Sequence, residues 1–432
     1  LMAQTDKPNI VIIMTDQQRA DLCGREGFPL AVTPYVDQLA QENVWFNKAY
    51  TVAPASSPAR CSMFTGRFPS ATHVRTNHNI PDIFFEQDLV GVLKENGYKT
   101  ALVGKNHAYL KPADLDFWSE YGHWGKNKKT TPEEKETARF LNQKARGQWL
   151  EPSPIPVEEQ HPAKIVNETL SWIESQKENP FFVWVSFPEP HNPYQVCEPY
   201  YSMFSPDKLP VLKTSRKDLE KKGEKYRILA ELEDASCPNL EQDLPRIRAN
   251  YIGMIRLIDD QIKRLIESLK ASGQFENTIF VLLGDHGKLV GSPDCEIPQS
   301  YNHVPLMIYG KGIKPEIRQE PGGQTDVAPT LLGLLNMSYT QNDFGINLLT
   351  EQRPYVYFSA DNLIAATDTT HLYIYSPHDR QEFKYKKQGN ALQLVTGEDS
   401  TFYVMKKYCF STLQSAEYLV KEHKTVNKAT GQ

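Results

Sequence analysis

Residues 8–18 have the sequence PNIVIIMTDQQ, an unbroken apolar run that ends at an aspartate. A short apolar run without alternation, rich in β-branched residues, is typical of a strand buried on both faces. Thr33 and Pro34 follow as a candidate N-cap and a first-turn proline, and they predict a helix over YVDQLAQENV. The stretch therefore predicts a unit of strand, loop and helix.

The same order of elements recurs along the chain. Predicted helices at 89–98, 165–176 and 248–272 are each followed by a predicted strand, at 99–104, 181–187 and 278–284. A further strand at 304–310 and a helix at 326–335 close the series. This alternation predicts an α/β fold with a large, mostly parallel sheet sandwiched by helices on both faces.

Two stretches interrupt the pattern, and the C-terminal part differs from it. Residues 122–163 and 200–245 are charged, contain prolines and have weak periodicity, which predicts surface insertions. Beyond Pro354, the short aromatic runs YVYFS, HLYIYS and FYVMK precede a helical pattern over 411–423. We therefore expect a catalytic domain over 8–350 and, over 351–432, a small antiparallel sheet with a terminal helix packed on it.

Composition excludes several classes of protein. The formal net charge is −5 and no long basic run occurs, so nucleic acid is not an expected partner. The longest apolar stretches are too short to cross a bilayer. The first residues lack an apolar signal core, which predicts either a cytoplasmic protein or one whose leader has been removed.

Polar residues that directly follow predicted strands are candidates for a binding site, because ligands of open α/β sheets bind beyond the carboxyl ends of the strands. Asp16 and Asp285 offer hard oxygen ligands, with Gln17 and His286 beside them. Each pair alone is typical of an ordinary turn or cap. Together, at two strand ends, they predict a site for one divalent cation of the calcium or magnesium type.

Positively charged and titratable residues follow the same rule of position. Lys105, His107 and His191 come directly after predicted strands, and Arg60 lies four residues beyond Ser56. Such a group would form a cationic pocket that suits a tetrahedral anion.

The stretch from Ser56 to Pro69, SSPARCSMFTGRFP, gives these residues a family context. Ser56-Ser57-Pro58-Ala59-Arg60 resembles the Cys/Ser-x-Pro-x-Arg signature of the type I sulfatases. In chain order, PNIVIIMTDQQ, GYKTALVGKNH, FPEPHNPY, LLGDHG and TDVAPTLLGLLN are similar to further segments of that family. The similarity extends over residues 8–340, and the ordered set is far more specific than any single motif.

The resemblance implies an alkaline-phosphatase-like fold and hydrolysis of sulfate esters by a formylglycine made at Ser56 by a maturation enzyme. It implies one divalent cation, Ca²⁺ or alternatively Mg²⁺, held by Asp16, Gln17, Asp285, His286 and residue 56. Arg60 and Lys105 would offset negative charge. His107 is the implied base that collapses the hemiacetal, and His191 the acid that protonates the leaving alcohol.

Three positions depart from the usual family pattern. Position 56 is Ser where most members have Cys, which indicates either a serine-type enzyme or a Cys→Ser replacement. Gln17 stands where Asp is commoner, which removes one negative charge. Many sulfatases have a lysine in the segment before Val304, but no lysine lies between Lys288 and Lys311 here. His303 is therefore a candidate for contact with sulfate; alternatively, it is a loop residue without a functional role.

The sequence is compatible with three functions. A sulfatase acting on a sulfated carbohydrate of glycosaminoglycan type is favoured, in part by the 21 tyrosines and 6 tryptophans. A phosphate or phosphonate ester hydrolase of the same superfamily and a non-catalytic carbohydrate-binding protein are the alternatives. Candidate saccharide contacts, besides His303, are Asn77, His78, Asn192 and Tyr194. We expect a monomer or homodimer in the periplasm or another extracytoplasmic compartment.

Overall fold

The computed structural model describes residues 7–143, 149–176, 178–211, 224–288, 303–339, 344–360, 363–388 and 391–430. The chain packs into two compact units. The first comprises Leu1–Trp45, Gly97–Asn106 and Leu110–Ile317, and the second comprises Phe46–Asn96, His107–Tyr109 and Arg318–Gln432. Both units are discontinuous in sequence and are defined by packing. The domain boundary that the sequence predicts between residues 350 and 351 stays a prediction.

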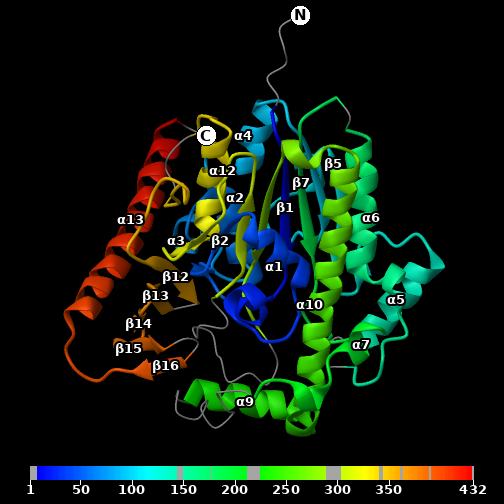
Figure 1. The fold of residues 1–432 in the computed structure, drawn as a ribbon. Helices are drawn as coiled ribbons and strands as arrows, with labels where there is room; N and C mark the ends of the chain where they lie inside the picture. Colours follow the sequence, from blue (N-terminus) through cyan, green and yellow to red (C-terminus); the bar gives the residue numbers. More distant parts are fainter. Residues whose placement is uncertain are drawn as a thin grey trace, which may run out of the picture. The chain divides into compact units, whose positions relative to one another are not determined.

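A large mixed sheet is the framework for the first unit (Figure 1). Its central strands β8, β1, β7, β4 and β5 are parallel to one another, whereas β9 pairs in antiparallel fashion with β8 and β2, and β6 with β5. Within the described residues the spatial order is β10 (Glu316–Arg318), β2 (Val44–Phe46), β9 (Leu306–Tyr309), β8 (Thr278–Gly284), β1 (Asn9–Thr15), β7 (Phe181–Phe187), β4 (Lys99–Gly104), β5 (Phe117–Gly122) and β6 (Gly125–Lys126). The mostly parallel sheet of the predicted α/β class is confirmed.

Three helices of the first unit share a hydrophobic core with the central strands. They are α1 (Pro34–Gln41), α6 (His161–Glu174) and α10 (Leu240–Ala271), and Figure 1 shows α6 and α10 running alongside the sheet. Every residue of β1, β7 and β8 is buried, as expected for strands with continuous apolar runs. Their rigidity fixes the positions of the residues that follow their carboxyl ends.

The interruption predicted over residues 122–163 contains more regular structure than its composition indicated. Strand β5 precedes it, β6 pairs with β5 as a hairpin, and α5 (Pro132–Gln143) follows. The sequence pattern did not predict β5, because the burial of this strand alternates and Ser119 and Glu120 interrupt its apolar residues. The other predicted insertion contains α7 (Tyr200–Met203) and α9 (Glu224–Ser236), and its residues 212–223 lie outside the described part.

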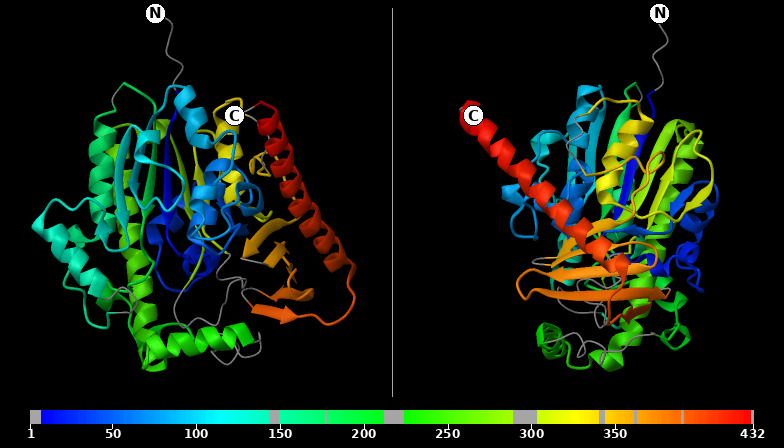
Figure 2. Two further views of the ribbon diagram at one scale, coloured as in Figure 1. Left: turned by 180° about the vertical axis from the view of Figure 1, so that it is seen from behind. Right: turned by 90° about the vertical axis from the view of Figure 1, so that its left-hand side faces the viewer.

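The second unit contains a five-stranded antiparallel sheet within its described residues. The strands are β12 (Val356–Ala360), β13 (Leu363–Thr367), β14 (His371–Ser376), β15 (Gln381–Gln388) and β16 (Ala391–Leu394). Helix α13 (Ser400–Thr430) crosses this sheet (Figure 2), and Phe402, Met405 and Cys409 from it pack against Tyr357 and Tyr373. The small sheet and terminal helix are confirmed.

The prediction of a strand for FYVMK is wrong, because these residues form the first turns of α13. Phe402 and Met405 are three residues apart and both buried, whereas Tyr403 and Val404 between them are exposed. This spacing suits one face of a helix. Four shorter helices also belong to the second unit: α2 (Ser56–Thr65), α3 (Pro69–Thr72), α4 (Leu89–Glu95) and α12 (Val327–Leu334). Among the described residues, no helix has the length and apolar character needed to cross a membrane.

Helix α1 is capped by a residue distant in sequence. Thr33 occupies the N-cap position, but its side chain makes no capping hydrogen bond. The amides of Tyr35 and Val36 instead donate to the carboxyl oxygens of Asp259 on α10, at 2.8 and 2.9 Å. Burial raises the pKa of Asp259 to about 7, although these two hydrogen bonds lower it. The carboxyl group therefore binds a proton more tightly in the folded chain than in the unfolded one.

This shift predicts a pH-dependent stability. Because the folded pKa lies above the unfolded value, the contribution of Asp259 to stability falls as the pH rises from about 4 to 7. When the pH is raised from 5 to 8, the free energy of unfolding should fall in the wild type by roughly 2–3 kcal/mol more than in the Asp259→Asn variant. Urea unfolding at both pH values measures this, with the exposed Lys263→Ala as a control. Parallel profiles for wild type and variant would contradict the assignment.

Candidate active site

Main-chain hydrogen bonds continue beyond the strand ends and hold the predicted site residues of the first unit together. The amide of Asp285, after β8, donates to the carbonyl of Thr15 on β1 at 3.1 Å. The amide of Asp16 donates to the carbonyl of Glu189 at 3.1 Å, and that of Lys105 to Ser186 at 2.8 Å. The ends of β8, β1, β7 and β4 are therefore fixed in register where their charged side chains begin.

Gly104 allows the last of these contacts. Its φ of 119° lies in a region that residues with a Cβ rarely adopt. A Cβ at this position would also collide with the main chain of Ser186. The glycine thus lets β4 turn sharply and deliver Lys105 directly beside β7.

The two strand-end aspartates meet as the sequence predicts. Asp16 and Asp285 have no exposed surface, and His286 is also buried. One ligand atom from each of these three residues lies within 4.8 Å of the others. Ca²⁺ binds oxygen at 2.3–2.6 Å, so an ion placed among these atoms would reach them all. The arrangement can hold a metal ion.

Gln17 is shaped for the same site. Its backbone has a φ of 65°, and its amide donates to Asp285 Oδ1 at 2.9 Å. The side-chain oxygen Oε1 is buried, and no group of the described residues donates to it. A buried amide oxygen without a partner is costly, whereas as a cation ligand it is satisfied. The donor set is therefore mostly oxygen, which suits a hard cation.

Lys105 lies against this set. Its ammonium group pairs with Asp16 Oδ2, and both side chains are buried. Isolated buried carboxylates are unfavourable, and the lysine supplies part of the compensating charge. Lys105 thus lies directly beside an acidic residue of the candidate cation site.

His191 is joined by a histidine that sequence analysis did not select. The rings of His191 and His123 stack with centroids 3.7 Å apart and planes inclined by 19°. His123 Nε2 lies 3.9 Å from Asp16 Oδ2. Burial, together with the nearby Lys105 and against the effect of Asp16, lowers the pKa of His191 to about 4. Its Nδ1 lies 2.6 Å from the carbonyl of Asn192, which requires Nδ1 to be the protonated nitrogen.

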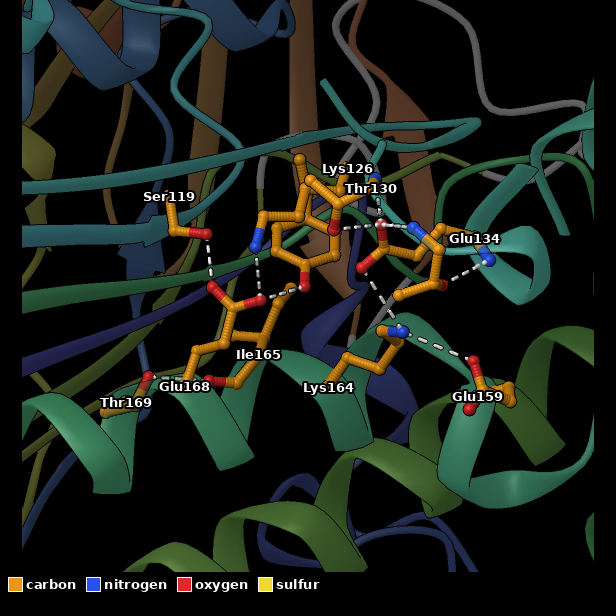
Figure 3. Close-up of polar contacts among 11 residues, drawn as sticks. Ser119, Lys126, Thr130, Glu134, Glu159, Lys164, Ile165, Glu168 and Thr169 are labelled. Atoms are coloured by element: carbon orange, nitrogen blue, oxygen red, sulfur yellow. Dashed lines mark hydrogen bonds and ion pairs between the residues drawn. The ribbon is translucent and has the colours of Figure 1, made fainter. Parts of the chain in front are cut away.

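A network of charged side chains holds the hairpin that carries His123 (Figure 3). The carboxylate of Glu168 on α6 accepts hydrogen bonds from Tyr121 and Lys126, at 2.7 and 2.8 Å, and from Ser119. These hydrogen bonds outweigh burial and hold the pKa of Glu168 below its ordinary value. Because Tyr121 and Lys126 flank the turn, Glu168 restrains the position of His123. Polar residues were selected where they directly follow a continuous apolar strand. His123 was not selected, because the strand before it, β5, is not continuously apolar.

In the second unit, the signature serine begins helix α2. Ser56 and Arg60 are both buried, and the amide of Ser57 donates to Asn77 Oδ1 at 3.0 Å. Helix α2 ends at Gly66, whose φ of 68° gives a left-handed C-cap. Ser56 thus occupies the amino end of a helix, where the dipole favours negative charge.

The remaining predicted residues have different surroundings. His107 belongs to the second unit and has a φ of 45°, and His78 is exposed there. His303 is buried in the first unit, with its Nε2 3.9 Å from Glu26 Oε2. The ring of Tyr194 has no exposed surface and packs against Tyr251 in the core, so we withdraw it from the saccharide contacts.

Comparison with known proteins gives these residues a family. The profile of the sulfatase family matches residues 8–337, most of the chain. The chain belongs to the sulfatase family. Members of this family are sulfuric ester hydrolases, and the chain is an enzyme of that class.

Individual relatives are similar over most of their length. The chain is 29% identical to an arylsulfatase of Clostridium perfringens, over 80% of this chain and 79% of that one. It is 22% identical in sequence to the phosphonate monoester hydrolase of Agrobacterium radiobacter, with a TM-score of 0.76 over 95% and 96% of the two chains. It also resembles BT4656, solved with D-glucosamine-2-N,6-O-disulfate, with 17% identity and a TM-score of 0.65 over 96% and 98%. Similarity to solved structures of this kind confirms the alkaline-phosphatase-like fold.

The ligand set predicts binding of one divalent cation per chain. After chelation and dialysis, calorimetric titration with Ca²⁺ should give a stoichiometry of one, and Asp285→Asn should weaken binding about tenfold or more through lost charge. The exposed Asp207→Asn is the control and should bind as the wild type does. Equal affinity in Asp285→Asn would disprove the ligand assignment.

Proposed function

We propose that the chain hydrolyses a sulfate ester of a saccharide, using a formylglycine at position 56 and one Ca²⁺ ion. The observation that carries this proposal is the grouping of Asp16, Asp285 and His286 with the ammonium group of Lys105. This is a site for one hard cation with a fixed positive charge beside it. The signature at Ser56 and Arg60 adds the nucleophile and a second positive charge. That both sets serve one substrate rests on the ordered family motifs.

A formylglycine accounts for turnover better than an ordinary serine. An attacking serine would become a stable sulfate ester, whose release would need a second attack at sulfur. The hydrated aldehyde has two hydroxyl groups, one of which attacks sulfur while the ester oxygen leaves with its electron pair. Deprotonation of the other hydroxyl then breaks the carbon–oxygen bond, expels sulfate and regenerates the aldehyde.

The residues of the chain divide the remaining tasks. A bound cation would lower the pKa of the attacking hydroxyl and polarise the sulfate oxygens. Lys105 and Arg60 stabilise the negative charge that develops at sulfate. His107 is proposed as the base that collapses the hemiacetal. His191 is proposed to protonate the leaving oxygen, and with Nδ1 fixed on the Asn192 carbonyl it presents Nε2 for this transfer.

Hydrolysis of a phosphate or phosphonate ester is the second candidate function, because the fold is similar to that of a phosphonate monoester hydrolase. Asp16, His123 and His191 also bring ligand atoms within 4.8 Å, which resembles a second metal site. Two features oppose it. Lys105 already pairs with Asp16 Oδ2, the oxygen that faces His123. The two imidazole planes are nearly parallel, so their in-plane lone pairs do not converge on one ion. This favours one cation and a sulfate ester.

A saccharide is the proposed substrate class, supported by the disulfated glucosamine bound to the similar fold of BT4656. Asn192 and His303 in the first unit, and Asn77 and His78 in the second, stay proposed contacts. An extracytoplasmic location also stays a prediction.

Maturation at position 56 is the direct test. Co-production of Ser56→Cys with a formylglycine-generating enzyme should yield a residue-56 peptide with the mass of formylglycine, together with release of inorganic sulfate from sulfated saccharides. Ser57→Cys is the matched control and should retain an unmodified thiol at 57. Ser56→Ala should lose essentially all turnover, because no nucleophile remains. Hydrolysis of added phosphate or phosphonate monoesters to free phosphate or phosphonate, without sulfate release, would support the alternative ester hydrolase. Neither activity would support a carbohydrate-binding protein.

A further inference from the structure

A small pocket in the first unit adjoins the stacked histidines. His123, His191 and Asn192 line it, and Leu141 and Met254 contribute apolar walls. Glu189, two residues before His191, is its acidic residue. All of these residues belong to the same unit, and none of them is a ligand in the proposed calcium site.

The carboxylate of Glu189 is only half satisfied. Its Oε1 lies 2.8 Å from His161 Nδ1, and both side chains are buried. Its Oε2 is buried as well, and within the described residues no group donates a hydrogen bond to it. Glu189 as a whole is 7% exposed. A buried carboxylate oxygen without a donor costs free energy, and a ligand that supplies one would recover it.

Neighbouring amides do not supply that donor. Gln160 and Gln195 bond to each other through both of their side-chain groups, at 3.2 and 3.0 Å. Gln195 lines the pocket, yet its amide is engaged in this pair. Glu189 Oε2 is therefore an acceptor of the pocket to which no described group donates.

A purely structural role does not account for this carboxylate. The contact that joins residue 189 to the cation site is made by its main chain, which accepts the amide hydrogen of Asp16. The side chain of Glu189 takes no part in that contact. The side chain pairs with His161 through one oxygen only, so its second oxygen has no structural use in the described part of the chain.

We propose that Glu189 is a specificity-determining residue that accepts a hydrogen bond from a hydroxyl or amino group vicinal to the sulfated carbon of the leaving alcohol. The inference rests on the proposed function, because His191 must lie within hydrogen-bond reach of the leaving oxygen to protonate it. Substituents on adjacent ring carbons are within hydrogen-bond distance of one another. An alcohol held at His191 thus brings its vicinal donor to the pocket that Glu189 lines.

Matched small esters test this independently of which saccharide is the substrate. Using the matured full-length chain, kcat/KM is measured for cyclohexyl sulfate, 2-hydroxycyclohexyl sulfate and 2-aminocyclohexyl sulfate as cis and trans isomers. The wild type should favour at least one donor-bearing ester by about 10- to 100-fold, the range for a hydrogen bond to a charged group. The hydroxyl and amino arms identify which donor the carboxylate accepts.

The variant Glu189→Gln should reduce that preference to a few-fold, since a neutral amide accepts more weakly than a carboxylate. Glu159→Gln is the matched control, because Glu159 pairs with Lys164 (Figure 3) and should leave the preference intact. Equal loss toward all three esters in Glu189→Gln would overturn the proposal in favour of a positioning role.

If Glu189→Gln does not fold, the comparison of the esters with the wild type still tests the proposal. A wild type that shows no preference for esters with a vicinal donor overturns the proposal. Failure of the proposed function is a different result. In that case no sulfate is released from any ester by chains with formylglycine at 56, and the inference falls with it.

Discussion

Three main-chain hydrogen bonds at the carboxyl ends of β8, β1 and β4 are the constraint on which the first unit's site depends. They join Asp285 to Thr15, Asp16 to Glu189 and Lys105 to Ser186. Because each bond involves the first residue after a strand or the turn beside it, the rigid sheet determines where the charged side chains start. A shift of one residue in any of these strands would turn its charged side chain to the opposite face. The chemistry of the site is thereby tied to sheet register.

The charges at this position suit the binding of a cation. Two buried aspartates are accompanied by one ammonium group, and Gln17 contributes an oxygen that no described donor satisfies. Buried carboxylates oppose folding unless their charge is compensated. The left-handed backbone of Gln17 adds a further cost at the same place. A divalent ion bound by these residues would offset these costs together.

Sequence was sufficient for the parts of the fold that have uniform patterns. Continuous apolar runs identified β1, β7 and β8, and the residues after them, Asp16, His191 and Asp285, were correctly placed at strand ends. Local sequence patterns gave wrong predictions where contacts with distant residues determine the secondary structure. The alternating burial of β5 concealed the hairpin that carries His123, and FYVMK belongs to a helix whose buried face contains Phe402 and Met405. Glu189 was part of a quoted motif, yet its half-satisfied carboxylate depends on His161, a contact across 28 positions that no local pattern contains.

The two stacked imidazoles connect the cation site to the pocket at Glu189, and their electrostatics constrain when a proton can be transferred. Two stacked rings disfavour a positive charge on each, and burial already lowers the pKa of His191 to about 4. In the absence of substrate, His191 is therefore neutral and its Nε2 is an acceptor. A bound sulfate ester brings negative charge to this region, which favours the protonated ring. In the proposed role of His191 as the acid, protonation of the ring would thus be coupled to occupancy by the anionic substrate.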